Sequence, residues 1–130
     1  MDTVAPLRVG VVGLGYAGTT HLEAYSAMPS VTVTALAGKE RPRLEELGRK
    51  HNIPALVDDW QDLVAIDDLD VVSIATPNAL HAPIAIAALA AGKHVFCEKP
   101  LATTAAEARE MAAAARTANR VLDVAFNHRR

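Results

Sequence analysis

Hydrophobic positions follow two different repeats along this chain. Runs rich in valine, isoleucine and alanine predict buried strands at residues 7–12, 31–37, 55–57, 71–75, 94–97 and 121–126. Between them, apolar residues recur every three or four positions, which predicts helices at 17–28, 42–50, 83–91 and from Thr104 to about Thr117, with a short helix that Asp58 or Asp59 caps and that runs through Leu63. Because strands alternate with helices over short connections, we expect an α/β domain with a parallel, doubly wound sheet covered by helices on both faces.

The composition fits a single globular domain over residues 1–130. The chain is 51% hydrophobic and 22% charged, which excludes a disordered chain, a collagen-like chain and a disulfide scaffold. A net charge of −2 gives no electrostatic reason to bind nucleic acid or an anionic membrane, and no segment has the pattern of a signal peptide or a membrane span. The only cysteine, Cys97, cannot form an internal disulfide and is expected to be an inert core thiol, so we expect a cytoplasmic protein.

A glycine-rich loop follows the first predicted strand. Gly13-Leu-Gly-Tyr-Ala-Gly18 fits the pattern G-x-G-x-x-G and opens a helix. Gly13 permits a tight turn, Gly15 lets backbone amides approach a pyrophosphate, and Gly18 lets the helix pack against the strand, with Tyr16 and Ala17 in the same phosphate-binding turn. The loop therefore predicts a Rossmann-type dinucleotide-binding domain with the strand order 3-2-1-4-5-6, and the alternative is a tight turn without a ligand.

The end of the second predicted strand bears on which dinucleotide is bound. About 20 residues beyond the glycine loop, the position that normally holds an acidic residue for the ribose 2′-hydroxyl is Gly38. A carboxylate there would repel a 2′-phosphate by roughly 4 kcal/mol per charge pair at 4 Å and an effective dielectric near 20. Its absence, with cations at Lys39, Arg41 and Arg43, favours NADP. Glu40 is an alternative partner for the ribose, and NAD would be the cofactor if its carboxylate held the ribose diol. The purely structural alternative for the three cations is a solvated basic turn at the start of a surface helix.

Two further segments carry a family resemblance. Thr76-Pro-Asn-Ala-Leu-His81 follows the fourth strand, and Gly92-Lys-His-Val-Phe-Cys-Glu-Lys-Pro100 runs through the fifth. With the glycine loop and the closing Ala125-Phe-Asn-His-Arg-Arg130, they resemble the glucose–fructose oxidoreductase/inositol dehydrogenase (Gfo/Idh/MocA) family over essentially the whole chain. The resemblance implies a two-domain, NAD(P)-dependent oxidoreductase that acts on sugars, inositols and related polyols.

The resemblance also implies roles for individual residues. Lys99 would touch the reacting hydroxyl or carbonyl of the substrate near the nicotinamide, where an ammonium can stabilise an alkoxide or share in proton transfer. Glu98 would hold the loop and its cofactor contacts, and Pro100 would fix the chain direction after Lys99 through a bond that is often cis in the family. Four residues after the fourth strand would line the ribose and nicotinamide end of the cofactor: Thr76, Pro77, Asn78 and His81. The structural alternative is that this segment only forms the turn between a strand and a helix, and that His81 only precedes that helix.

The resemblance extends beyond this chain to a second, mostly antiparallel sheet domain. In the family that C-terminal domain supplies the substrate wall and most oligomer contacts, so we expect the substrate domain to be absent here and a full-length parent to be a homo-oligomer. Without it, we expect Lys99 to support little or no turnover. Two other hypotheses stay open: a non-catalytic NADP(H)-binding or docking module, and a nucleotide-free domain kept for assembly.

A metal site is not expected. His21, His51 and His128 have no partner at metal-ligand spacing. Trp60 is expected to anchor a helix face rather than to contact the cofactor.

Overall fold

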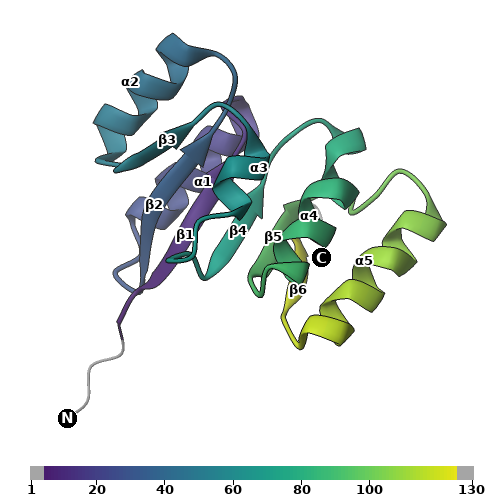
Figure 1. The fold of residues 1–130 in the computed structure, drawn as a ribbon. Helices are drawn as coiled ribbons and strands as arrows, with labels where there is room; N and C mark the ends of the chain where they lie inside the picture. The colour runs from purple at the N-terminus through teal and green to yellow at the C-terminus, as the bar shows by residue number, and fades with distance from the viewer. Residues whose placement is uncertain (1–4, 126–130) are drawn as a thin grey trace.

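The computed structural model describes residues 5–125 and shows one parallel, six-stranded sheet (Figure 1). Its strands are β1 (Leu7–Val12), β2 (Val31–Ala37), β3 (Ala55–Val57), β4 (Val71–Ile74), β5 (His94–Glu98) and β6 (Leu122–Ala125). They lie in the order β3-β2-β1-β4-β5-β6, and each neighbouring pair is parallel. The predicted fold class and strand order are therefore confirmed. Phe126, to which the prediction extended the last strand, and the closing residues 127–130 lie outside the described residues.

The helices connect these strands close to where the apolar repeat places them. They are α1 (Tyr16–Ser26), α2 (Arg41–His51), α3 (Trp60–Val64), α4 (His81–Ala90) and α5 (Ala105–Ala118), with a short 3₁₀ helix, η1 (Asn78–Leu80), before α4. Two helix ends differ from prediction by two residues: α1 ends at Ser26 rather than at Met28, and α4 begins two residues before Pro83. Pro83 fits there because the first amides of a helix have no intrahelical acceptor, so its missing N–H removes no bond.

The helix ends show which of the capping residues in the sequence make capping contacts in the structure. Thr104 caps α5, and its side chain accepts a hydrogen bond from the Glu107 amide at 3.1 Å, as the predicted capping spacing requires. Asp59 occupies the N-cap of α3, but its side chain makes no capping hydrogen bond. α2 and α5 end at Asn52 and Asn119, which both adopt the left-handed conformation with φ of 55°.

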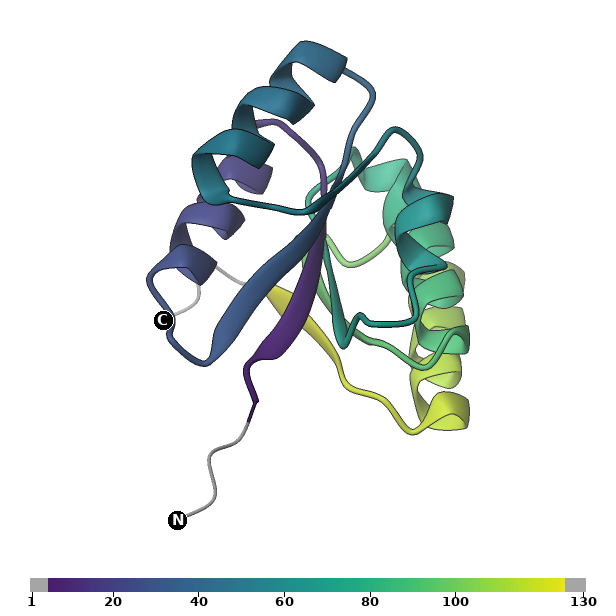
Figure 2. The same ribbon diagram turned by 60° about the vertical axis from the view of Figure 1, so that its left-hand side comes forward.

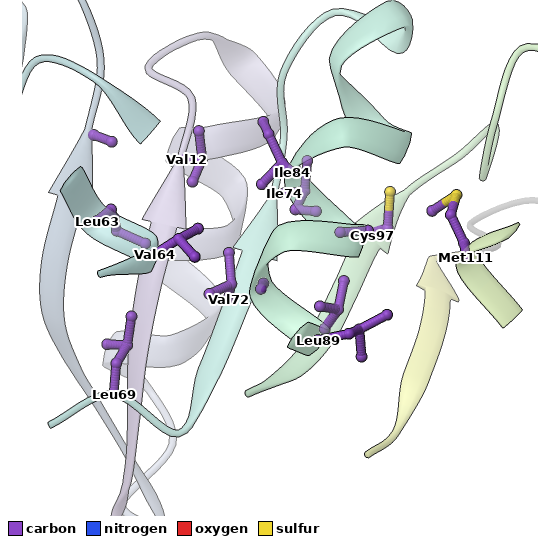
Figure 3. Packing of buried hydrophobic residues seen from close by; sticks show 14 of the residues in the cluster. Val12, Leu63, Val64, Leu69, Val72, Ile74, Ile84, Leu89, Cys97 and Met111 are labelled. Carbon is purple, nitrogen blue, oxygen red and sulfur yellow. The ribbon is translucent and has the colours of Figure 1, made fainter. Parts of the chain in front are cut away.

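Helices cover both faces of the sheet, and each face has its own apolar core (Figure 2). On one face, Leu22 of α1 and Leu44 of α2 pack with Val9 and Val11 of β1. The opposite face carries α3, α4 and α5 over a larger cluster that includes Val12 (Figure 3), whereas its neighbour Val11 belongs to the first core. Successive β1 side chains thus enter opposite cores, which fixes the strand between two helical layers.

No helix among the described residues is long and apolar enough to cross a membrane.

Candidate functional site

The carboxyl ends of β1 to β4 surround a cavity of about 460 Å³. The chain leaves β1 toward β2 on one side and leaves β4 toward β5 on the other, so the two strands flank the point at which the strand order reverses (Figure 1). Open α/β sheets bind ligands at this position. The cavity is lined by residues 12–15, 37–40, Asp58, Trp60, 75–77 and Leu80.

Two glycines of the loop after β1 are required by the packing of the chain itself. Gly13 has φ of +123°, and a Cβ there would lie 2.2 Å from the carbonyl oxygen of Ala75. A Cβ on Gly18 would lie 2.2 Å from the carbonyl oxygen of Gly13, because the first turn of α1 rests directly on the loop. The tight turn and the close helix packing expected of these residues are both present.

Gly15 differs from both. Its φ of −82° is open to any residue, and no atom lies within 4 Å of the position that its Cβ would take. Gly15 is the N-cap of α1, no side chain caps this helix, and the first amides of a helix have no intrahelical partner. Since Gly15 also lines the cavity, the uncapped start of α1 opens onto it, an arrangement suited to an anion.

At the end of β2, Gly38 is explained by its neighbour Leu14. A Cβ at position 38 would lie 2.3–2.8 Å from the side-chain carbons of Leu14, which also lines the cavity. A side chain at position 38 would therefore require Leu14 to shift from its present position. Glu40, the alternative partner for the ribose, lines the same cavity.

The cations predicted near Gly38 are held in ion pairs. The Lys39 ammonium lies 2.5 Å from Oδ1 of Asp59, and this hydrogen bond, reinforced by the carboxylate charge, raises the pKa of Lys39. The Arg41 guanidinium contacts Oδ1 of Asp58 at 3.2 Å and Oε2 of Glu45 at 3.3 Å. Lys39 lies on the cavity wall, whereas Arg41 lies outside the lining.

The segment after β4 divides between the cavity and the core. Thr76 and Pro77 line the cavity, and Asn78 is exposed in η1. His81 is fully buried, with Nδ1 2.7 Å from the Pro100 carbonyl oxygen and Nε2 3.0 Å from that of Thr76. A neutral imidazole donates to one of these carbonyls and a protonated ring donates to both. Both ring nitrogens of His81 thus face backbone carbonyls and the side chain lies outside the cavity lining, so its contact with a cofactor stays a prediction.

The segment after β5 presents the predicted catalytic lysine. Lys99 and Pro100 are exposed, and the peptide bond between them is cis. Nothing in the described part of the chain withdraws the Lys99 ammonium from water.

Glu98 is held by a buried polar network that the sequence reasoning missed. Nε2 of His21 lies 2.9 Å from Oε2 of Glu98, and Nδ1 lies 2.7 Å from Oγ of Ser73, which also bonds the Tyr25 hydroxyl at 2.8 Å. Burial raises the pKa of Tyr25. Although a serine, a histidine and a carboxylate meet here, Ser73 is fully buried and cannot reach a substrate, so the network positions Glu98. His21 and Tyr25, one helical turn apart, were the available signal.

Cys97 lies in the core, as predicted. It is fully buried, and burial raises its pKa to about 12. Within residues 5–125 no group of three histidine, cysteine or acidic residues is placed to hold a metal ion.

The predicted site residues fall into two groups. The cavity brings together Gly13, Gly15, Gly38, Lys39, Thr76 and Pro77. Outside its lining lie Tyr16, Ala17, Gly18, Arg41, Asn78, His81, Glu98, Lys99 and Pro100.

Besides Glu40 and Trp60, six lining residues were not predicted as part of the site: Val12, Leu14, Ala37, Asp58, Ala75 and Leu80. Trp60 packs against the core, as expected of a helix anchor, and also lines the cavity. Apolar and acidic side chains of this kind carry no motif, so only the tertiary structure identifies them.

Known proteins are similar to this chain in sequence and in architecture. The model of the Gfo/Idh/MocA family, an oxidoreductase family with an NAD-binding Rossmann fold, matches residues 7–126. Levoglucosan dehydrogenase of Pseudarthrobacter phenanthrenivorans is 43% identical over 95% of this chain and 34% of its own length. The scyllo-inositol 2-dehydrogenase (NADP(+)) of Bacillus subtilis is 35% identical over 89% of this chain and 35% of its own.

A solved structure of levoglucosan dehydrogenase in complex with NADH superposes with a TM-score of 0.88 at 41% identity. The match covers 95% of this chain and 36% of that one. The chain thus spans about a third of the length of the curated relatives it matches.

Proposed function

Since the chain belongs to the Gfo/Idh/MocA oxidoreductase family, we propose that its cavity binds a nicotinamide dinucleotide. The chain is then the cofactor domain of an enzyme that transfers hydride to or from a sugar, an inositol or a related polyol. This substrate class is the one named by the inositol and levoglucosan dehydrogenases among its relatives.

The observation that carries the proposal is the open glycine at position 15. The fold requires glycine at positions 13 and 18, where a Cβ would collide with backbone, but not at position 15. A ligand that approaches the backbone closely explains the absence of a side chain there. A pyrophosphate is such a ligand, because it accepts hydrogen bonds from the free amides at the start of α1.

The remaining lining residues follow from this placement. The adenosine ribose would lie against Gly38 and Lys39, and Leu14, Trp60 and Leu80 would supply apolar contacts nearby. Thr76 and Pro77, after β4, would line the side toward the nicotinamide.

Lys99 is the residue of this chain that we propose acts at the reacting oxygen. When bound, the nicotinamide supplies or accepts the hydride. In carbonyl reduction the Lys99 ammonium would stabilise the negative charge on the substrate oxygen and donate a proton to it, and in alcohol oxidation the neutral amine would accept the proton of the substrate hydroxyl. Lys99 is exposed here. The part of the enzyme that encloses it and positions the substrate is therefore proposed to lie in the two-thirds of the relatives' length that this chain does not match.

We propose NADP as the preferred cofactor. Position 38 carries no carboxylate, so no side chain at this position repels a 2′-phosphate. Lys39 on the cavity wall offers a cation within reach of such a group. One buried, reduced cysteine is consistent with a cytoplasmic enzyme, and the full-length form is proposed to be a homo-oligomer.

Calorimetric titration of the chain with NADPH and, separately, with NADH tests these assignments. We expect saturable binding of both, with the lower Kd for NADPH. Binding of neither cofactor would overturn the proposed function, and a lower Kd for NADH would overturn the NADP preference alone.

Lys99→Met separates an enzyme domain from a non-catalytic module. The variant should keep the dinucleotide Kd, since Lys99 lies outside the cavity lining. In a form of the protein as long as its relatives, it should lose hydride transfer, whereas a binding module has no such activity to lose. The 130 residues alone should show little or no turnover, and family-like rates from them would contradict our placement of the substrate wall elsewhere.

A further inference from the structure

We propose that Asp58 and Asp59 are positioning residues that limit how strongly this cavity prefers a 2′-phosphate over a 2′-hydroxyl. They do so by holding Lys39 and Arg41 in ion pairs. The inference rests on the proposed function, because it requires that the cavity bind a nicotinamide dinucleotide.

The sheet register places these four side chains together. β2 and β3 are parallel, Ala37 pairs with Val57, and the Gly38 amide donates to the Val57 carbonyl at 3.1 Å. The residues that follow the two strands therefore emerge side by side at the carboxyl edge of the sheet. There the Lys39 ammonium meets Asp59 at 2.5 Å, and the Arg41 guanidinium meets Asp58 at 3.2 Å.

Within residues 5–125, neither carboxylate makes a side-chain hydrogen bond or ion pair that competes with this pairing. Asp59 stands at the N-cap of α3, where an aspartate usually accepts a bond from a helix amide, yet its side chain makes no such bond and contacts Lys39 instead. Asp58 precedes the helix and lines the cavity. Both carboxylates are thus placed where they act on the cations and on any anion beside them.

The rim of the cavity carries more negative than positive charge as a result. Lys39 and Arg41 are opposed by Glu40, Asp58 and Asp59, which leaves a net charge of −1 over these five residues. A 2′-phosphate must draw the cations away from their carboxylates and then lie close to those carboxylates. A 2′-hydroxyl does neither, so the affinity for NADH should not depend on these two ion pairs.

Asp58→Asn and Asp59→Asn test this inference by calorimetric titration with NADPH and NADH. Each variant should raise the ratio of NADPH to NADH affinity by about two- to fivefold, and the double variant by about tenfold, because the pairs are exposed and individually weak. Asparagine also serves as an N-cap residue, so the fold is expected to survive at position 59, and Asp58 lies outside the helix. Thermal unfolding of each variant checks this.

Asp68→Asn is the matched control. It makes the same change in net charge and breaks an exposed ion pair, with Arg8 at 3.7 Å, but neither residue lines the cavity. It should change the affinity ratio less than about twofold. The gain from the Asp58 and Asp59 variants should also shrink between about 0.05 and about 0.5 M salt, since these two side chains are 51–62% exposed.

The outcomes are distinct. A ratio that rises in the Asp58 and Asp59 variants and not in Asp68→Asn supports the inference. A ratio that is unchanged, or that rises equally in the control, overturns it while leaving dinucleotide binding intact. Failure of the unsubstituted chain to bind either cofactor overturns the proposed function itself.

Discussion

Gly15→Ala should leave the fold intact and weaken dinucleotide binding. The added methyl meets no atom within 4 Å, and the φ of −82° suits alanine. Two small effects on stability oppose each other: alanine is a poorer N-cap than glycine, and it restricts the unfolded chain. We expect the free energy of unfolding to change by less than about 0.5 kcal/mol.

The loss of affinity can be estimated from hydrogen-bond geometry. A phosphate oxygen bound to a backbone amide lies about 2.9 Å from the nitrogen. A methyl on the same residue restricts that approach, because carbon and oxygen atoms prefer to stay about 3.5 Å apart. Loss of one hydrogen bond to a charged group costs about 1.5–3 kcal/mol. The Kd for NADH and NADPH should therefore rise by about ten- to 150-fold.

The assay combines calorimetric titration with urea unfolding, and Gly92→Ala is the control. Gly92 also has no atom within 4 Å of its Cβ position, but its φ is +83° and it lies outside the cavity lining. Alanine there should cost about 1 kcal/mol of stability through backbone strain and leave the Kd unchanged.

Gly15→Ala should thus change the dinucleotide Kd but not the stability, and Gly92→Ala should change the stability but not the Kd. Unchanged dinucleotide affinity in Gly15→Ala would refute the view that position 15 is glycine because a ligand lies against it. A loss of stability above about 1.5 kcal/mol in the same variant would refute the view that the fold tolerates a side chain there.

Three further predictions concern the framework. Gly18→Ala places a methyl 2.2 Å from the Gly13 carbonyl oxygen, so α1 must shift, and urea unfolding should show a loss of about 2–3 kcal/mol. The hydrogen bonds from the Arg8 side chain, and then its backbone amide, lower the pKa of Asp70. Because this pKa is below its unfolded value, the stabilisation is complete above about pH 4 and is lost as the pH falls through the folded pKa. Asp70→Asn should therefore cost about 1 kcal/mol near pH 7 and progressively less as the pH falls below about 4, as measured by urea unfolding across this range. With a pKa of about 12, Cys97 should resist a thiol-specific reagent at about pH 8 in the folded chain and react on unfolding, and rapid labelling of the native protein would contradict its burial.

The fold was predictable because its signals are local. Each strand is a short apolar run, and once the elements alternate, the right-handed crossover leaves few strand orders to consider. Gly13 and Gly18 were interpretable for the same reason, since a turn between a strand and a helix places both within one loop. Local reasoning erred by two residues at the start of α4, because Pro83 tolerates a place inside the first helical turn.

The site was less predictable because its contacts join distant residues. His21 and Glu98 are 77 positions apart, and the sequence shows only that His21 and Tyr25 share a helix face. Asp59 has the residue type and position of a cap, yet in the folded chain the Lys39 ammonium at the end of the neighbouring strand takes its carboxylate. A capping preference of about 1 kcal/mol is small enough for such a contact to override.

The segment that carries Lys99 shows how buried groups determine the position of an exposed one. On one side of Lys99, Glu98 is held by His21 from α1, and on the other side the Pro100 carbonyl is held by His81 from α4. The two histidines come from helices on opposite faces of the sheet, and both are buried. A displacement of the Lys99 backbone would therefore disturb a partly buried hydrogen bond on at least one side, and a buried polar group left unpaired costs about 1–3 kcal/mol. The ammonium is exposed to water, but the backbone on either side of it is held by two buried histidines, which is the kind of support that the catalytic role proposed for Lys99 requires.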